Sequence, residues 1–246
     1  MCTLTFAWQV FEDAPLLVAA NRDEVLDRPS EPPARRDWET DVVAPRDSRA
    51  DGTWLGYNEH GVVVGITNRW LDADIEGERS RGLLVRDALG AETAEEAVRT
   101  VERELVEQTY DGFNLIAADT NAAVLVESGH ERRVRALSPG VHVVVNVGAD
   151  GGYAVPARRQ EAGEQQARNA DAVRGALKPE PGERPAGWLD RAAAVLGDHE
   201  YGVCVHGDGF GTKSASLLWL ADDKRRYEFA DGPPCESDFE RVAAEV

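Results

Sequence analysis

The chain has 246 residues and a net charge of −18. This length can bury a substantial core without disulfides, and we predict a single domain over residues 1–246. The acidic balance excludes a general nucleic-acid binder, because phosphate-backbone binding draws on clustered Lys and Arg. No apolar run approaches the roughly 18 residues of a membrane span, and the N-terminus lacks signal-peptide features. We therefore expect no membrane span and a cytoplasmic location.

The basic residues are unusually uniform, since all but three of the 27 are arginine. An acidic, lysine-poor surface suits a cytosol at high salt, where the Debye length falls to about 3 Å at 1 M and repulsion between carboxylates is screened. We therefore hypothesise a halophilic host. The alternative is an ordinary acidic protein, whose melting would not depend on salt.

The three cysteines, Cys2, Cys204 and Cys235, form an odd set without a C-x-x-C pair. This pattern predicts neither a disulfide framework nor a zinc site. The five histidines show no metal-ligand spacing either. The sequence thus predicts no metal site and no required cofactor, and any reactive thiol has to be argued from its surroundings.

The first predicted elements are two strands, Thr3–Phe11 and Pro15–Ala20, joined by a short turn. The following stretch, Arg28–Asp51, is rich in Pro and Arg and has no apolar period, so we expect a long surface loop. A hairpin over Thr53–Tyr57 and Val62–Thr67 comes next.

The middle of the chain predicts two helices and then four strands. One helix begins at Ser80 and ends at Gly90, and the other runs from Thr93 to about Gln108. Thr93 and Glu96 have the spacing of a capping box. The strands have the spacing of an antiparallel meander and cover residues 113–118, 122–127, 132–137 and 141–146.

The last third mixes helices and strands without regular βαβ alternation. This order favours an α+β protein with helices packed outside mostly antiparallel sheets. The predicted elements are helices over Val155–Leu177 and Gly187–Leu196, strands over Tyr201–His206, Ser214–Leu220 and Arg226–Phe229, and a short helix after Cys235.

Cys2 is the first candidate catalytic residue. Removal of Met1 would place a thiol and a free α-amine on one residue. An α-amine has a reference pKa near 8 and a thiol near 8.5, so modest help from the surroundings gives a useful base or thiolate at neutral pH. The alternative is a small, inert residue at position 2.

A second candidate feature is the tetrapeptide Asn21-Arg22-Asp23-Glu24, placed where the second strand should end beside Cys2. The aspartate could accept a hydrogen bond from the amine of Cys2, and the arginine could lower the thiol pKa or bind an acyl carbonyl. Alternation puts Asn21 and Asp23 on one face and Arg22 on the other. The alternative is a solvated turn with a weak surface ion pair.

Further polar or glycine-flanked positions lie near the ends of predicted strands. The segment Gly52–Gly56 surrounds Trp54 with glycines and suggests backbone close to a pocket with Trp54 as a wall. Asn68, Asn114 and Asn146 each lie near an apolar strand, where a buried amide needs partners. We interpret Asn114 as structural.

Together these residues resemble the NRDE family, also called the transport and Golgi organisation 2 homologues, which is named for the tetrapeptide. The matching pieces occur in family order from residue 1 to about 220. They are Met1-Cys2, Asn21-Arg22-Asp23-Glu24, Gly52-Thr53-Trp54-Leu55-Gly56, Thr67-Asn68-Arg69, Ser80-Arg81-Gly82, Phe113-Asn114-Leu115, Asn146 and Gly211-Thr212.

The family is similar to cysteine N-terminal-nucleophile hydrolases such as the choloylglycine hydrolases and acid-ceramidase relatives. The resemblance implies a four-layer αββα sandwich of mostly antiparallel sheets. The hydrolases place their Arg and Asp three residues apart, whereas Arg22 and Asp23 are adjacent in this sequence. Lys213 replaces the usual arginine after Gly-Thr. The implied catalytic residues are Cys2 as nucleophile, Arg22 and Asp23 as an orienting pair, and Asn68 and Asn146 as oxyanion or substrate donors; the implied substrate-binding residues are Asn21, Trp54, Arg69 and Lys213.

The resemblance leads to two functional hypotheses that the sequence leaves open. One is an amidohydrolase that cleaves a C–N amide bond of a small or lipid-like substrate with Cys2. The other is a non-catalytic carrier that binds or traffics haem or a lipid in the same pocket, the role proposed for eukaryotic relatives, with the thiolate as a haem ligand. A fold does not fix a function, and the sequence predicts no oligomeric state.

Overall fold

The computed structural model describes residues 2–221, 224–244 and 246. The chain forms two compact units, Met1–Asp27 with Pro139–Val242 and Arg28–Ser138 with Ala243–Val246. Each unit combines one antiparallel sheet with two α-helices. The single domain over residues 1–246 stays a prediction.

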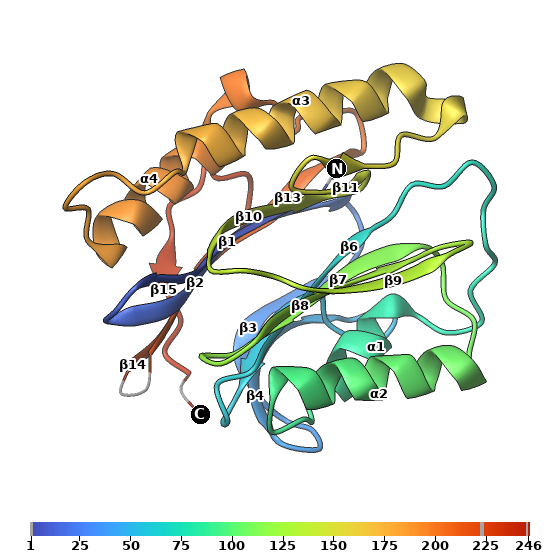
Figure 1. Ribbon diagram of the computed structural model, residues 1–246, viewed down its shortest axis with the longest axis horizontal. Coiled ribbons are helices and arrows are strands. Elements are labelled where there is room, and N and C mark those ends of the chain that lie inside the picture. The colour runs from blue at the N-terminus through green and yellow to red at the C-terminus, as the bar shows by residue number, and fades with distance from the viewer. Residues whose placement is uncertain (1, 222–223, 245) are drawn as a thin grey trace. The chain divides into compact units, whose positions relative to one another are not determined.

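The first unit is built on a sheet of eight strands among the described residues, ordered β12-β11-β10-β1-β2-β13-β14-β15. Helix α3 (Gln160–Ala176) packs on β10 and helix α4 (Pro185–Gly197) packs on β2, so both cover the same sheet (Figure 1). The strands are β1 (Thr3–Phe11), β2 (Ala14–Val25), β10 (Gly140–Val145), β11 (Gly148–Ala149), β12 (Gly152–Tyr153), β13 (Phe210–Ala221), β14 (Lys224–Ala230) and β15 (Glu240–Arg241).

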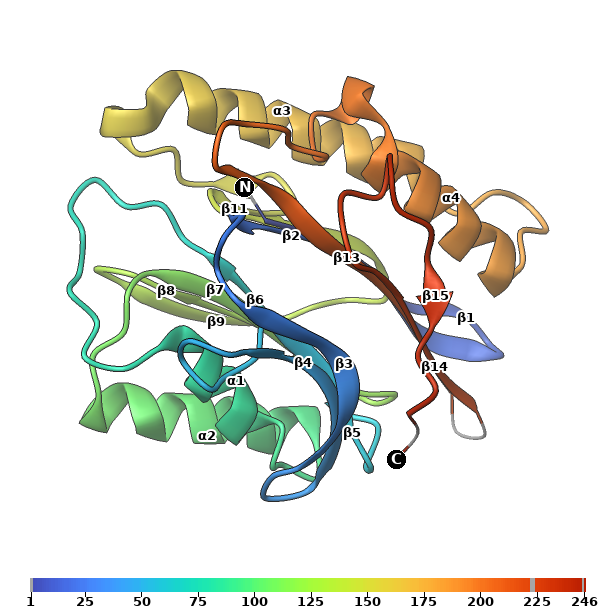
Figure 2. The ribbon, with the colours of Figure 1, turned by 180° about the vertical axis from the view of Figure 1, so that it is seen from behind.

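The second unit is built on a sheet of seven strands in the described part of the chain, ordered β3-β4-β5-β6-β7-β8-β9. Helices α1 (Arg81–Ala88) and α2 (Ala94–Glu107) lie together on this sheet, as Figure 2 shows from behind. The strands are β3 (Ser30–Asp37), β4 (Asp41–Asp47), β5 (Leu55–Asn58), β6 (Val63–Asn68), β7 (Phe113–Ala118), β8 (Ala123–Ser128) and β9 (Arg132–Ala136).

Helices α1 and α2 begin where the sequence predicts, with Ser80 and Thr93 as their N-caps. Ser80 Oγ accepts a hydrogen bond from the Gly82 amide, and Thr93 Oγ1 accepts one from the Glu96 amide at 3.2 Å. The Glu96 carboxylate does not complete a capping box on Thr93 but accepts from the Glu92 amide at 3.2 Å. The apolar side of α2, with Ala97, Val98 and Val101, is buried in the core of the second unit.

The predicted long loop over Arg28–Asp51 is wrong, because this stretch forms the paired strands β3 and β4. β3 is the edge strand of its sheet, and a bulge interrupts its pairing between Glu31 and Ala34. An edge position and a bulge are where a sheet tolerates proline, which cannot donate to the ladder. The prolines therefore led to the prediction of a loop where the chain forms an edge strand.

Two elements predicted near the C-terminus are also wrong. Tyr201–His206 is not a strand but follows a short 3₁₀ helix, His199–Tyr201, that ends at Gly202 in the left-handed region with φ 62°. The segment after Cys235 forms a turn and then β15 rather than a helix. Prolines 233 and 234 precede this turn, and the Glu236 amide donates to the Pro233 carbonyl at 2.9 Å.

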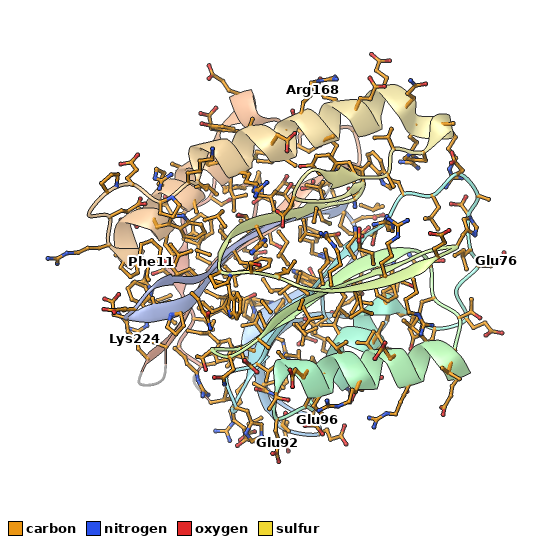
Figure 3. All side chains as sticks on the ribbon, in the orientation of Figure 1. Phe11, Glu76, Glu92, Glu96, Arg168 and Lys224 are labelled. Carbon is orange, nitrogen blue, oxygen red and sulfur yellow. The ribbon has the colours of Figure 1, made fainter. Side chains whose placement is uncertain are left out.

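The other predicted helices and strands overlap the observed ones, and the α+β class with antiparallel sheets is confirmed. None of the helices in the described ranges has both the length and the apolar character of a membrane span. The charged side chains of Glu76, Glu92, Glu96 and Arg168 point outward from the ribbon (Figure 3).

Candidate active site

Cys2 lies at the start of the first strand, beside the end of β2. Thr3 of β1 pairs with Asn21 of β2, so the same register, continued by one residue, places Cys2 across from Arg22. The Cys2 thiol donates a hydrogen bond to the backbone carbonyl of Asp23, with Sγ and O 3.5 Å apart. The structure therefore brings together the thiol and the tetrapeptide as predicted, while Met1 lies outside the described residues.

The Asn21-Arg22-Asp23 segment is not a solvated turn. It lies inside β2, and the side chains of all three residues are buried. On its other side β2 pairs with β13, where Thr212 is opposite Asp23 and Ser214 is opposite Arg22. Three adjacent buried polar residues in a central strand are costly to desolvate, which argues for a functional role.

Asp23 is held by a threonine from the neighbouring strand. Thr212 Oγ1 donates to Asp23 Oδ1 at 2.5 Å and itself accepts from the Val205 amide at 2.8 Å. Burial raises the pKa of the Asp23 carboxyl, and the hydrogen bond from Thr212 partly opposes this shift. Thr212 belongs to the Gly211-Thr212 motif, but the sequence analysis assigned it no role.

The surroundings of Cys2 raise the pKa of its thiol and so disfavour the reactive thiolate. Burial raises the pKa of this thiol, the negative charge of Asp23 raises it further, and the positive charge of Arg22 opposes the shift. The resting group is therefore a protonated thiol at neutral pH. A nucleophilic role requires a base that removes its proton during the reaction.

β1 pairs with β2 on one side and with β10 on the other, and Asn146 follows β10 on that second side of Cys2. Leu4 of β1 pairs with Val144 of β10, so the ladder continued by two residues brings Cys2 opposite Asn146. Gln166 of α3 donates through Nε2 to Asn146 Oδ1 at 2.8 Å and accepts from the Val147 amide at 3.1 Å. These bonds fix the orientation of the Asn146 amide, as a preorganised hydrogen-bond donor requires.

Gln166 is a positioning residue that the sequence analysis missed. It is buried on the α3 stripe that also carries Gly163, Ala170 and Val173. A polar side chain at this spacing within an apolar stripe needs a partner, so the signal was present in the sequence.

Asn21 and Lys213 make contacts within the protein. Asn21 uses its amide nitrogen to donate to the carbonyls of Leu196 at 3.0 Å and Val203 at 2.9 Å. Lys213 is the extra residue of a bulge in β13, and its Nζ donates to the Leu26 carbonyl at 2.7 Å. Both contacts are structural, and their predicted substrate-binding roles stay predictions.

The other predicted site residues belong to the second unit. Asn68 is exposed at the end of β6, and Trp54 is half-buried, with its carbonyl accepting from the Ile66 amide at 2.9 Å. The Arg69 guanidinium donates to Asn114 Oδ1 at 2.6 Å and Glu127 Oε1 at 2.8 Å. These contacts lie within the second unit, the interpretation of Asn114 as structural stays a prediction, and so does the predicted substrate-binding role of Arg69.

The glycines around Trp54 serve close backbone packing. A Cβ on Gly52 would lie 2.2 Å from the carbonyl carbon of Gly82, and the Thr53 amide donates to the Gly82 carbonyl at 3.0 Å. Two sequence motifs therefore meet backbone to backbone at the start of α1. This contact gives Gly52 and Gly82 a packing role.

The sequence analysis also missed a group of four side chains in the first unit. His199, Cys204, His206 and Cys235 offer ligand atoms that all lie within 4.8 Å of one another. The four residues come from three separate segments, so no local spacing in the sequence indicates the group.

The fold is that of the N-terminal-nucleophile hydrolases. The chain is similar to penicillin V acylase from Agrobacterium tumefaciens, with 16% identity, a TM-score of 0.55 and coverage of 94% of this chain and 83% of that one. It is also similar to the Caenorhabditis elegans ortholog of N-acylethanolamine-hydrolyzing acid amidase, with 14% identity, a TM-score of 0.59 and coverage of 90% and 94%. A variant of the conjugated bile acid hydrolase from Clostridium perfringens matches at 13% identity and a TM-score of 0.52, over 100% and 99%.

The chain belongs to the Transport and Golgi organisation 2 family, whose model matches residues 1–178. It is 31% identical over 140 residues to the Transport and Golgi organization protein 2 homolog of Bos taurus, which covers 53% of this chain and 50% of that protein. The Homo sapiens homolog is 33% identical over 113 residues, or 44% of this chain and 40% of that protein. The matches thus span half or less of these relatives' length, and the resemblance predicted from the motifs is confirmed.

Proposed function

We propose that the protein is a cysteine amidohydrolase that cleaves a C–N amide bond of a small or lipid-like substrate, with Cys2 as the nucleophile. The single observation that carries this proposal is the Cys2 thiol held at 3.5 Å from the Asp23 carbonyl, beside buried Arg22 and Asp23. The three structural neighbours are named as an acylase, an amidase and a hydrolase of conjugated bile acids, which supports the same reaction class.

The proposed reaction begins when the free α-amine of Cys2 takes the thiol proton. The sulfur then attacks the amide carbon, and the carbonyl oxygen becomes an oxyanion that Asn146 and backbone amides stabilise. The C–N bond breaks, the amine leaves with the proton from the Cys2 ammonium, and a thioester remains. Water attacks the thioester with the α-amine as base, which releases a carboxylic acid and restores the thiol.

The raised pKa of the thiol fits this sequence of proton transfers. A buried thiol that stays protonated needs an immediate base, and the α-amine of the same residue is the closest group that the proposal supplies. Arg22 stabilises the thiolate as it forms, and Asp23 holds the ammonium. Thr212 and Gln166 act as positioning residues, because they touch Asp23 and Asn146 rather than the substrate.

The test is turnover of a panel of amides, from short acyl amides to long-chain N-acyl amines, by wild type, Cys2→Ala and Cys2→Ser. We expect at least one amide to be cleaved, with a loss of about 10³-fold or more in both variants. His130→Asn, at an exposed histidine of the second unit, is the matched control and should keep full turnover. Equal turnover in Cys2→Ala and wild type would contradict the proposal.

The rival proposal is a non-catalytic carrier of haem or lipid, and the family description, which concerns transport, favours it. Here the Cys2 thiolate would bind haem iron or the side chain would line the pocket. Haem titration separates the two. A Soret shift that is lost in Cys2→Ala, with no turnover of any amide in wild type, would support the carrier over the hydrolase.

A further inference from the structure

A group of two cysteines and two histidines lies in the first unit apart from the proposed nucleophile. Cys204 and His206 stand on either side of Val205, His199 lies in the 3₁₀ helix after α4, and Cys235 lies in the turn after β14. The four ligand atoms lie within 4.8 Å of one another. Neither the fold nor the proposed hydrolysis requires such a cluster.

The distances among the ligand atoms of Cys204, His206 and Cys235 are close to those between ligands of one tetrahedral metal ion, and His199 offers its atom within 4.8 Å of the other three. Zn–S bonds of about 2.3 Å and Zn–N bonds of about 2.0–2.1 Å place tetrahedral ligands about 3.3–3.8 Å apart. The Cys204 and Cys235 sulfurs are 3.5 Å apart, and His206 Nε2 is 3.7 Å from the first and 3.1 Å from the second. The His199 ring meets the His206 ring edge-on, with centroids 5.1 Å apart.

The backbone around the cluster is fixed by contacts that do not involve the ligands. The Val205 amide donates to Thr212 Oγ1, and the Thr212 amide donates to the Val205 carbonyl, both at 2.8 Å. Asn169 of α3 donates to the Gly202 carbonyl at 3.2 Å, which holds the chain between His199 and Cys204. The segment that carries Cys204 and His206 is thus held in place by β13 and α3.

We propose that His199, Cys204, His206 and Cys235 bind one Zn²⁺ ion in a tetrahedral Cys2His2 site. Two thiolates and two imidazoles are the ligand set that zinc takes in closed structural sites, and four protein ligands leave no open position for a reacting water. Cys204 is buried, whereas the other three ligands are exposed, so the ion has a path from solvent. The site is therefore structural rather than catalytic.

The zinc site would also support the proposed nucleophile. Val205, between two of the ligands, is bound to Thr212, and Thr212 donates to Asp23 at 2.5 Å. Metal binding would therefore fix the loop that orients Asp23, as contacts beyond the first coordination shell do in other metal proteins. This consequence depends on the proposed function, but the zinc site does not.

The test uses protein purified without a histidine tag, under reducing conditions, then loaded with Zn²⁺ and dialysed. We expect one equivalent of zinc by elemental analysis, and loading with Co²⁺ to give tetrahedral d–d bands and sulfur-to-cobalt charge transfer. Cys204→Ser, Cys235→Ser and His206→Asn should each lose the bound equivalent. Cys2→Ala and His130→Asn, which remove a thiol and an imidazole elsewhere, should retain it.

Wild-type protein alone keeps the test decisive if the ligand variants fail to fold. A chelator titration of the zinc-loaded protein should lower Tm as the metal leaves, and zinc should restore it. Wild type that binds only substoichiometric zinc and shows no cobalt bands would overturn the proposal. A mass lower by two hydrogens that persists in reductant, with no metal, would overturn it in favour of a Cys204–Cys235 disulfide.

Discussion

Each unit contains a buried region of arginine and carboxylate side chains, just after β6 in the second unit and within β2 in the first, and the two regions are built in different ways. In the second unit, Arg69 lies 2.8 Å from Glu127, with side chains only 11% and 7% exposed, and also bonds to Asn114. In the first unit, Arg22 and Asp23 are buried side by side, and burial raises the pKa of Asp23. The Arg69 charge is thus matched by Glu127, whereas Arg22 is paired with Glu24 at 3.7 Å and the Asp23 carboxyl carries the cost of its burial.

We propose that this difference separates a structural polar cluster from a functional one. Buried charges that are matched in geometry hold strands together, whereas a buried carboxyl with a raised pKa costs stability and persists where it serves chemistry. Both clusters come from sequence motifs of the family, Thr67-Asn68-Arg69 and Asn21-Arg22-Asp23-Glu24. The motif alone therefore does not tell which cluster acts on a substrate.

The largest effect on stability should come from breaking the matched pair. Glu127→Ala leaves the Arg69 charge buried without its carboxylate and should lower the free energy of unfolding by about 3–5 kcal/mol. Glu131→Ala is the control, because its pair with Arg133 is exposed at 65% and 78% and should cost less than about 1 kcal/mol. Denaturant unfolding measures the loss of unfolding free energy in both variants, and equal losses would contradict the prediction.

A smaller loss is expected where Thr212 supports Asp23. Thr212→Val keeps the shape but removes the donor to Asp23 and the acceptor of the Val205 amide, so it should cost about 1–3 kcal/mol. Turnover should fall as well, because Asp23 loses its orientation. Ser128→Ala, at the end of β8, is the control for a hydroxyl removed from a strand. A Thr212→Val protein with wild-type stability would show that this bond is unimportant.

The pH dependence of stability should have opposite signs at Asp23 and Asp150. Burial raises the pKa of Asp23, so the native state binds its proton more tightly, and the contribution to stability falls as pH rises from about 3.9 through the folded pKa. Burial also opposes ionisation of Asp150, but the hydrogen bonds from His142 at 2.6 Å and from the Val143 amide at 3.0 Å, together with nearby positive charge, outweigh it and lower the pKa. The contribution of Asp150 is therefore lost as pH falls through its folded pKa.

Isosteric variants measure these two slopes. Asp23→Asn should gain stability relative to wild type as the pH rises, while its turnover falls by about 10²-fold or more. Asp150→Asn should lose stability at neutral pH, and the difference should disappear in acid. The measurement is the difference in Tm between each variant and wild type as a function of pH. If this difference changed with pH in the same direction for both variants, the assigned pKa shifts would be contradicted.

Salt should give the smallest effect per residue and test the halophilic hypothesis. Exposed pairs such as Arg133–Glu131 and repulsion among surface carboxylates are screened at high ionic strength, whereas the Arg69–Glu127 pair is screened much less. Wild-type Tm should rise towards about 1 M salt, and the cost of Glu127→Ala should stay nearly constant. Melting that does not depend on salt would end the hypothesis.

The sequence predicted the parts that local patterns determine. Apolar alternation located β1 and β2, and Thr93 located the start of α2. The strands β3 and β4 escaped prediction because prolines lie on an edge strand, where tertiary pairing outweighs propensity. The segment after α4 was not predicted correctly because two of its hydrogen bonds go to the side chains of Asn21 and Thr212 rather than into a regular backbone ladder.

The candidate site was predictable only in part, for the same reason. The motifs indicated Cys2, Arg22 and Asp23, which the β1–β2 register brings together. The partner of Asn146 lies on α3, and only three-dimensional packing pairs it with Gln166. Three ligands of the proposed zinc site lie within residues 199–206, and only the fold brings the distant Cys235 to them.

Intact mass after brief exposure to an electrophilic amide or acyl probe tests the role of Cys2 most directly. We predict a wild-type mass that shows removal of Met1 and a single acyl adduct, which peptide mapping places on Cys2. Cys2→Ala should lose the adduct that maps to residue 2, with any labelling of the exposed Cys235 mapped separately, and Glu127→Gln should still form it if folded. Retention of Met1 in the natural host, or a wild-type protein that is labelled at Cys235 but not at Cys2, would contradict the account.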